Sequence, residues 1–425
     1  MSRPPSVMDD QRRITPRLVG IVLSGLVGNV MEWYDFAVYG YFATVIGQLF
    51  FPAENPAMSL VASFGAFAAG FVARPLGGLL FGRIGDRVGR ERAMMVSVLA
   101  MAIPTLLMCL LPTYQSVGIV APVLLIALRI VQGLSVGGEF TSSMIFLSEQ
   151  APPKHRSFIA IWGNWGATAG ILLGSGVGLL VSGNLTEAQL EAWGWRIPFA
   201  LGGVVAMVGW WVRRHLRVEI PIARSESPVK VLFSRHRGAV LRVALLNSGI
   251  SVAFYTTFIY AVSYIRSIDR LPESLALELN TLSMLVLLLV LPISAWLADR
   301  YGSRGMLNVA LGLLTVLAIP LFQLLHSPHA ESILIGEVAF ALLVGMASSG
   351  VIGLNTSLIP HPVRCTGLAF AYNAASLFGG TTPMIAAWLI NTTHTPLAPA
   401  GWLFGAVLLS TLTLVLAVPK TLATD

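Results

Sequence analysis

The sequence is poor in charge. Asp, Glu, Lys and Arg make up only 11% of its 425 residues, whereas 55% are hydrophobic. Soluble proteins carry about 25% charged residues, so this composition excludes an ordinary soluble protein and indicates an integral membrane protein. Cysteine is also scarce: Cys109 and Cys365 fall near the ends of apolar segments that we expect at opposite membrane faces. A disulfide between them is therefore excluded, because bridged Cα atoms lie within about 7 Å of each other.

Motifs for catalysis and cofactor binding are missing as well. The sequence has no metal-ligand spacing, no phosphate-binding loop and no segment for the nucleotide domain of an ATP-driven pump. The stretch GLSVG at 133–137 matches a serine nucleophile elbow, but that motif needs a strand-to-helix turn and here falls inside an apolar helix. We therefore expect neither an enzyme nor a cofactor or metal. The N-terminus is polar and the first apolar segment is too long for a signal peptide.

Long apolar segments dominate what is present. A membrane helix needs roughly 20 apolar residues to cross about 30 Å of hydrocarbon. We predict twelve such spans: 18–47, 58–81, 93–112, 117–148, 157–182, 196–212, 240–265, 276–298, 306–325, 332–358, 365–391 and 401–419. The predicted fold is an all-α membrane protein with twelve transmembrane helices in two six-helix, pseudo-symmetric bundles. The bundles would span 18–212 and 240–419, with a central loop at 213–239 and tails at 1–17 and 420–425.

Basic residues are placed asymmetrically about this predicted membrane. Of the 27 Lys and Arg residues, only Arg196, Arg266 and Arg270 fall in loops on one side, while Arg74 and Arg129 fall within spans. The others collect on the opposite side. Because cytoplasmic loops carry the excess of Lys and Arg, we predict that both termini lie in the cytoplasm, in a bacterial inner membrane. The basic charge is then an orientation signal, and no nucleic-acid partner is expected.

The two halves of the chain repeat each other. FGRIGDRVGRER follows the second predicted span and ISAWLADRYGSRG follows the eighth, so Asp86 and Asp299 occupy matching places. PPKHRSFIAIW similarly matches HPVRCTGLAFAY, which pairs Arg156 with Arg364. Two repeated halves predict a transporter whose binding site lies between them, near the middle of the membrane.

The loop after the second span predicts a conformational gate. Gly82 and Gly89 allow a tight turn, and Asp86 can accept hydrogen bonds from the N-terminus of a neighbouring helix. The loop arginines can pair with acids such as Glu149, which would latch one half against the other. A basic loop that only sets orientation is the alternative, and the second copy argues against it. The full predicted gate is Gly82, Asp86, Arg87, Gly89, Arg90, Glu149, Arg156, Asp299, Arg300 and Arg364.

These residues carry a family resemblance. The loop resembles the signature loop of the major facilitator superfamily, and its weaker copy stands where that superfamily repeats it. GNVMEWYDFAVYGYF, FVARPLGGLLFGRIGDRVGR, ALRIVQGLSVGGEF, WGWRIPF and VRCTGLAFAYN are similar to the metabolite:proton symporters, which include porters for proline and betaine, citrate, 2-oxoglutarate and shikimate. The resemblance covers most of the chain. It implies proton-driven uptake of a small solute that usually bears a carboxylate.

Two carboxylates interrupt the first apolar segment. Glu32 and Asp35 lie three residues apart and share one helix face with Asn29 and Tyr39, two polar residues that we expect to bind the substrate. A carboxylate at the centre of a membrane helix costs about 2.5–3.5 kcal/mol on insertion scales, so both should face protein or a water-filled cavity. Burial and mutual repulsion favour the protonated form of at least one, which could bind and release the coupling proton. Alternatively both are structural acids, held by hydrogen bonds or by a basic residue.

The fourth span carries a polar stripe. Arg129, Gln132, Val136, Glu139 and Ser143 follow each other at intervals of three and four residues, on a single helix face. The fork of donors of Arg129 could hold a substrate carboxylate, or Arg129 could neutralise one of the acids of the first span. Glu139 lies nearer the cytoplasm and could relay the proton. Gln132 completes the expected substrate contacts of this span.

Other polar and aromatic side chains could line the cavity. Aromatic rings can hold a quaternary ammonium by cation–π contact, although ordinary helix packing explains each of them equally well: Trp162, Tyr255 and Tyr372. Amides within a hydrocarbon layer need partners, which makes three asparagines of the second half substrate-binding candidates: Asn247, Asn355 and Asn373.

We therefore predict a proton-coupled symporter that imports a small carboxylate-bearing or zwitterionic metabolite by alternating access, working as a monomer in the lipid bilayer. An exporter driven by proton antiport is one alternative, but the antiporter branches often carry a proline in the glycine-rich fifth span. Here that span has only the GxxxG ladder of Gly166, Gly170, Gly174 and Gly178, which predicts close helix packing. A sensor on a transporter fold is the other alternative. Such proteins usually add a soluble domain, and only six residues follow Pro419.

Overall fold

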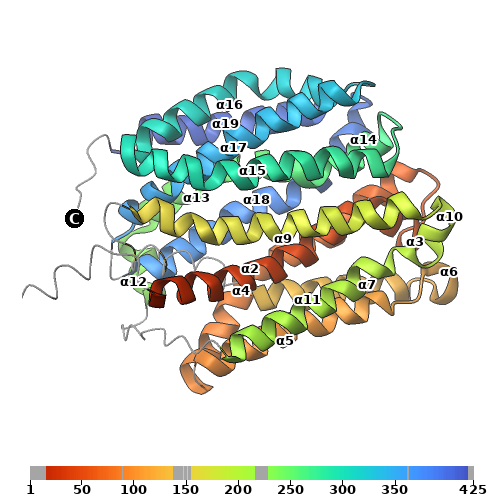
Figure 1. The fold of residues 1–425 in the computed structure, drawn as a ribbon, viewed down its shortest axis with the longest axis horizontal. Coiled ribbons are helices and arrows are strands. Elements are labelled where there is room, and N and C mark those ends of the chain that lie inside the picture. The colour runs from red at the N-terminus through yellow and green to blue at the C-terminus, as the bar shows by residue number, and fades with distance from the viewer. Residues whose placement is uncertain are drawn as a thin grey trace, which may run out of the picture.

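The chain is a bundle of long helices. A computed structural model describes residues 16–88, 90–136, 147, 151, 155–215, 228–360 and 363–419, and all regular structure in these ranges is helical. The long helices run side by side along one direction (Figure 1). They are α2 (Pro16–Tyr41), α3 (Ala43–Phe50), α4 (Pro56–Val88), α5 (Arg90–Cys109), α6 (Tyr114–Val117), α7 (Val120–Val136), α9 (Arg156–Asn184), α10 (Glu187–Gln189), α11 (Arg196–His215), α12 (Pro228–Arg235), α13 (Arg237–Tyr255), α14 (Ala261–Ser267), α15 (Glu273–Tyr301), α16 (Ser303–Leu325), α17 (Ala330–Leu358), α18 (Arg364–Thr393) and α19 (Ala398–Leu412). Three π-helical segments adjoin them: η2 (Leu190–Gly194), η3 (Thr256–Tyr260) and η5 (Thr413–Ala417).

The helices follow the apolar pattern of the sequence. Each of the twelve predicted spans contains helix. Within the described ranges, seven helices are long and apolar enough to cross a membrane, and three more apolar helices are shorter: Leu99–Cys109, Val120–Val136 and Arg196–Val208. The all-helical class predicted from the sequence is confirmed.

The bundle has two distinct ends. Helix α12 and the start of α2 lie at the left in Figure 1, and we call this the terminal end. The short helices α3, α6 and α10 lie at the right, and we call this the distal end. Both names are used below to locate contacts along the long axis.

Helix pairs from the two halves meet along two seams, α4 with α18 and α9 with α15. The most extensive helix contact within the first half is between α2 and α9. A Cβ atom on Gly170 of α9 would lie 2.3 Å from the carbonyl oxygen of Val30 on α2, so only glycine permits this approach. The glycine ladder therefore packs α9 against the helix that carries Glu32 and Asp35.

The predicted loop at 82–92 is mostly helical, which corrects the expectation of a tight turn that begins at Gly82. Helix α4 continues to Val88, so Gly82, Asp86 and Arg87 belong to its last turns, and Arg90 is the first residue of α5. Extending a formed helix adds a hydrogen bond for each residue, which offsets the cost of about 1 kcal/mol for an internal glycine. The side chains of these four residues lie outside the described part of the chain, as does Gly89.

The second copy of this loop contains the expected turn. Helix α15 ends at Tyr301 and α16 begins at Ser303, with Gly302 between them at φ 99°. A side chain would be strained at this φ, so the glycine is required by the backbone. Gly302 occupies the place of Gly89 in the repeat.

Candidate functional site

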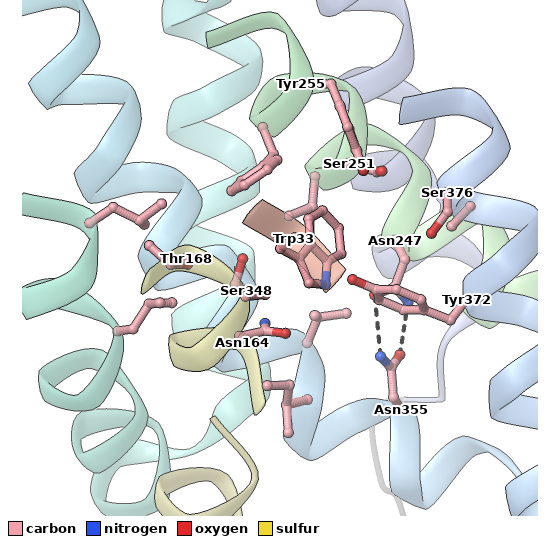
Figure 2. Close-up of a pocket in the computed structure, with 18 residues that line it drawn as sticks. Trp33, Asn164, Thr168, Asn247, Ser251, Tyr255, Ser348, Asn355, Tyr372 and Ser376 are labelled. Atoms are coloured by element: carbon pink, nitrogen blue, oxygen red, sulfur yellow. Dashed lines mark hydrogen bonds between the residues drawn. The ribbon is translucent and has the colours of Figure 1, made fainter. Parts of the chain in front are cut away.

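A pocket lies between the two halves, near the middle of the bundle. It encloses about 760 Å³, including space open to its surroundings, and is lined by α2 and α9 on one side and by α13, α15, α17 and α18 on the other. Its polar lining side chains are all neutral (Figure 2): Trp33, Asn164, Thr168, Asn247, Ser251, Tyr255, Ser348, Asn355, Tyr372 and Ser376.

Four of the predicted substrate residues reach this pocket: Asn247, Tyr255, Asn355 and Tyr372. The two amides bond to each other across α13 and α17 (Figure 2). The Asn247 amide donates to Asn355 Oδ1 at 3.0 Å, and the Asn355 amide donates back to Asn247 Oδ1 at 3.2 Å. Their reciprocal pairing satisfies both groups inside the bundle.

Other predicted substrate residues lie away from the lining. Asn29 ties α2 to α9 by donating to the Gly163 carbonyl at 3.0 Å, and Tyr39 ties α2 to α4 by donating to the Ser63 carbonyl at 3.0 Å. Trp162 packs against Trp165, with ring centroids 5.4 Å apart. Asn373 is buried next to the pocket residue Tyr372 but is not part of the lining.

Several lining residues were not predicted from the sequence. Their spacing could have indicated a shared helix face, since each lies four or seven residues from another lining residue on the same helix. The pairs and triplets are Asn164 with Thr168, Asn247 with Ser251 and Tyr255, Ser348 with Asn355, and Tyr372 with Ser376. Small hydroxyl side chains are common in membrane helices, and this makes the signal weak without the pocket.

Asp35 and Arg129 form a buried ion pair. Arg129 Nη1 lies 3.4 Å from Asp35 Oδ2 and also donates to Gln132 Oε1 at 2.9 Å. Thr105 donates to Asp35 Oδ1 at 2.7 Å and accepts from the Gln132 amide at 3.0 Å. Arg129 is fully buried and Asp35 is 2% exposed. Arg129 of the fourth span therefore pairs with an acid of the first span, which is one of the two roles that the sequence left open for it.

Glu32 pairs with Arg74, a residue that the sequence analysis placed within a span but gave no role. Arg74 Nη2 lies 3.9 Å from Glu32 Oε1, and Arg74 is 2% exposed. The guanidinium stands over three rings, with its carbon 4.1 Å from the centroid of Phe71, 4.4 Å from Phe36 and 5.6 Å from Trp33. An arginine in an apolar run was the signal that could have identified it.

The two ion pairs share one aromatic neighbour. The guanidinium carbon of Arg129 lies 4.6 Å from the Phe36 centroid, close to the 4.4 Å of Arg74. Two acids and two arginines thus form a cluster without net charge beside an uncharged pocket. Removing one member would leave a buried charge uncompensated, which is the costly state in a membrane interior.

Glu337 is a buried acid in the second half. It is fully buried in α17, and neither carboxylate oxygen makes a hydrogen bond within the described ranges. Ser283 is near, but its hydroxyl donates to the Asn280 carbonyl at 2.9 Å. An isolated carboxylate is costly in such surroundings, so the neutral acid is the form that suits this site.

Polar contacts join the two halves on either side of the pocket. At the terminal end, Asp299 of α15 accepts from the backbone N–H of Ser157 at 3.0 Å and of Phe158 at 2.9 Å, in the first turn of α9. Toward the distal end, Asn280 of α15 donates to the Tyr41 hydroxyl at 2.9 Å and to Ser175 Oγ at 3.2 Å. We call these contacts the terminal latch and the distal latch.

The remaining gate residues are placed as follows. Arg364 donates to the Ile359 carbonyl at 3.2 Å, and the guanidinium of Arg300 lies 5.4 Å from the Trp296 ring. Arg156 begins α9, but its side chain lies outside the described ranges. Glu139 and Glu149 lie entirely outside the described ranges.

Known proteins resemble this chain in sequence and in fold. A family model described as sugar (and other) transporter matches residues 21–215. The chain is 33% identical over 399 residues to the proline/betaine transporter of Escherichia coli K12, covering 90% of this chain and 80% of that protein. It is 34% identical over 385 residues to the shikimate transporter of the same strain, covering 87% of each. The xylose transporter of E. coli, in a partially occluded inward-open conformation, shares the fold with a TM-score of 0.73 at 17% identity, over 95% of this chain and 100% of that chain.

Proposed function

The chain belongs to the major facilitator transporters, in the family of the bacterial proline/betaine and shikimate transporters, and from this premise we propose a proton-coupled symporter. It imports a small carboxylate-bearing or zwitterionic metabolite by alternating access. The observation that carries the proposal is the cluster of two buried acid–arginine pairs beside a neutral pocket between the halves. A proton can neutralise either acid, and each protonation would release an arginine for new contacts.

The two latches supply the conformational part of the proposal. Alternating access needs contacts between the halves that break in turn on the two sides of the site. The terminal latch joins α9 to α15, and the distal latch joins α2 and α9 to α15. We propose that the bundles 18–212 and 240–419 rock against each other as these contacts alternate. The gate residues beyond the described ranges would act with the terminal latch.

The orientation proposed from the charge distribution assigns the terminal end to the cytoplasm. The start of α2 and helix α12 lie there (Figure 1). The solute would therefore enter at the distal latch and leave at the terminal latch. The protein would work as a monomer in the inner membrane, with protons and one small solute as its partners.

The test is proton movement driven by solute. De-energised cells that express the protein are suspended in weak buffer, and citrate, 2-oxoglutarate, shikimate, proline or betaine is added in separate trials. Proton symport makes the medium alkaline with the transported solute, and Glu32→Gln, which cannot bind and release a proton, abolishes this signal. Acidification by an added solute would indicate antiport. An unchanged pH dependence in Glu32→Gln would exclude Glu32 from coupling.

A matched control is available at the distal end. Arg266 and Glu273 form an ion pair there, away from the pocket. Glu273→Gln removes a carboxylate with the same change of side chain as Glu32→Gln. Loss of alkalinisation in the first variant but not in the second would tie proton coupling to the cluster beside the pocket.

A further inference from the structure

Buried donors near the pocket have no acceptor. Nε and Nη2 of Arg74 and the hydroxyl of Tyr255 make no hydrogen bond within the described ranges. Both side chains are 2% exposed. Because buried donors in native proteins are almost always paired, such a group of unpaired donors indicates a ligand that carries acceptor atoms.

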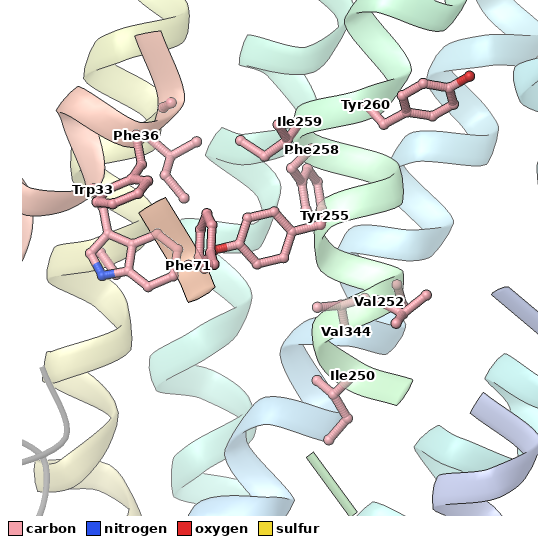
Figure 3. Packing of buried hydrophobic residues seen from close by; sticks show 14 of the residues in the cluster. Trp33, Phe36, Phe71, Ile250, Val252, Tyr255, Phe258, Ile259, Tyr260 and Val344 are labelled. Atoms are coloured by element: carbon pink, nitrogen blue, oxygen red, sulfur yellow. The ribbon is translucent and has the colours of Figure 1, made fainter. Parts of the chain in front are cut away.

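These donors converge on one wall of the pocket. The Arg74 guanidinium stands 4.1 Å from the Phe71 centroid, and the Tyr255 ring meets the same ring edge-on with centroids 5.4 Å apart. Figure 3 shows the Tyr255 hydroxyl pointing toward Phe71 and Trp33. Tyr255 lines the pocket directly, and Arg74, which is not part of the lining, stands over the ring of the lining residue Trp33.

We propose that Arg74 and the Tyr255 hydroxyl bind the carboxylate of the solute, and that Glu32 takes up the coupling proton in exchange. Without solute, Glu32 neutralises Arg74 across 3.9 Å. When the solute binds, its carboxylate takes the place of Glu32 on Arg74, and Glu32 receives one proton from water. One negative charge enters with one positive charge, so the net charge of the cluster is unchanged. The inference rests on the proposed symport and specifies its exchange site.

The longer distance between the charged atoms identifies Glu32 and Arg74, rather than Asp35 and Arg129, as the exchange pair. Arg129 and Asp35 approach to 3.4 Å and share hydrogen bonds with Gln132 and Thr105, whereas the Glu32–Arg74 distance exceeds hydrogen-bond range. The other ionisable groups around Glu32 and Arg74 come from four helices: Asp35 on α2, Arg129 on α7, Tyr255 on α13 and Tyr372 on α18. Of these, only the two tyrosines line the pocket.

This arrangement also sets the class of solute. The guanidinium fork matches one carboxylate through two parallel hydrogen bonds. The described pocket lining holds no charged side chain that could neutralise a second carboxylate. A solute with one carboxylate should therefore bind more tightly than a dicarboxylate, and far more tightly than its own amide or ester.

The test is calorimetry on purified protein in lipid nanodiscs, with L-proline and shikimate as acids and L-prolinamide and methyl shikimate as counterparts that lack the carboxylate. Titrations in two buffers with different heats of ionisation give the number of protons taken up per solute bound. Wild type should bind the acids with about one proton each. Arg74→Gln should lower acid affinity by roughly 10- to 100-fold, because a charge-assisted hydrogen-bond donor is lost. Arg74→Lys, which keeps the charge but loses the fork, should fall between them.

Glu32→Gln separates the two parts of the proposal. It should bind the acids at least as tightly as wild type but take up no proton. Arg266→Gln, which removes an arginine at the distal end, is the control and should bind as wild type does. The inference is overturned if Arg74→Gln binds the acids like wild type, if the counterparts without a carboxylate bind equally well, or if wild type binds neither acid. A wild type that accumulates solute without protons would instead overturn the symport itself.

Discussion

The ion pair of Asp35 and Arg129 allows a quantitative prediction. At 3.4 Å, two opposite charges attract by about 5 kcal/mol at an effective dielectric constant of about 20. Both side chains are at most 2% exposed, so water does not replace a lost partner. Arg129→Gln or Asp35→Asn alone should therefore destabilise the protein by about 3–5 kcal/mol, because each leaves a buried charge. The double variant removes both charges and should recover most of that loss, apart from the packing lost where Gln is smaller than Arg.

The assay is thermal unfolding of the purified variants in nanodiscs. At about 2 °C for each kcal/mol, the single variants should melt roughly 5–10 °C below wild type. The double variant should melt within about 3 °C of wild type. The reasoning is refuted if the losses of the single variants simply add in the double variant, since the two charges would then be independent. Thr105→Val, which removes a neutral neighbour of the pair, should cost only about 1 kcal/mol.

Three further predictions concern the frame around the site. Asp299→Asn weakens the terminal latch by about 1 kcal/mol, so a cysteine at Ser348 in the pocket should react several-fold faster with a water-soluble maleimide; equal rates would exclude this latch from gating. Gly170→Val should abolish folded protein in size-exclusion chromatography, whereas Gly176→Val, at a position with open space, should leave the yield unchanged. Burial raises the pKa of Asp269, in the loop after α14, above its ordinary value although His326 donates to it. The folded state then holds this proton more tightly than the unfolded state, so stability falls as pH rises above about 4 until Asp269 is ionised. Asp269→Asn should flatten that part of a melting-temperature profile, and an unchanged slope would count against it.

The sequence predicted the helices well because their signal is local. Apolar length marks each span, and charge bias gives an orientation. The main error, the loop at 82–92, arose because a polar segment can continue a helix beyond the apolar run, and composition does not show where it ends. The positive φ of Gly302 places the turn of the second copy at this glycine. The internal repeat therefore located that turn more accurately than the polarity of the segment did.

The site was harder to predict because it depends on which helix faces meet. Spacing showed that Glu32 and Asp35 share a face, but not that each has its own arginine. Arg74 and Arg129 come from helices packed closely together, with a Cβ on Gly133 of α7 only 1.9 Å from the carbonyl oxygen of Gly70 on α4. Periodicity within one helix carries no such information about its neighbours. For the same reason Asn29 was assigned to the solute although it bonds to α9.

The terminal latch has a consequence for how the protein tolerates mutation. Asp299 contributes the only side chain to this contact, because its partners are the backbone N–H groups of Ser157 and Phe158. Any residue except proline keeps those donors. Most substitutions of Ser157 and Phe158 should therefore leave this contact intact, while nearly all substitutions of Asp299 disrupt it. A mutational scan would show Asp299 as intolerant of substitution and its two partner residues as tolerant. A salt bridge between two side chains would instead make both sides intolerant.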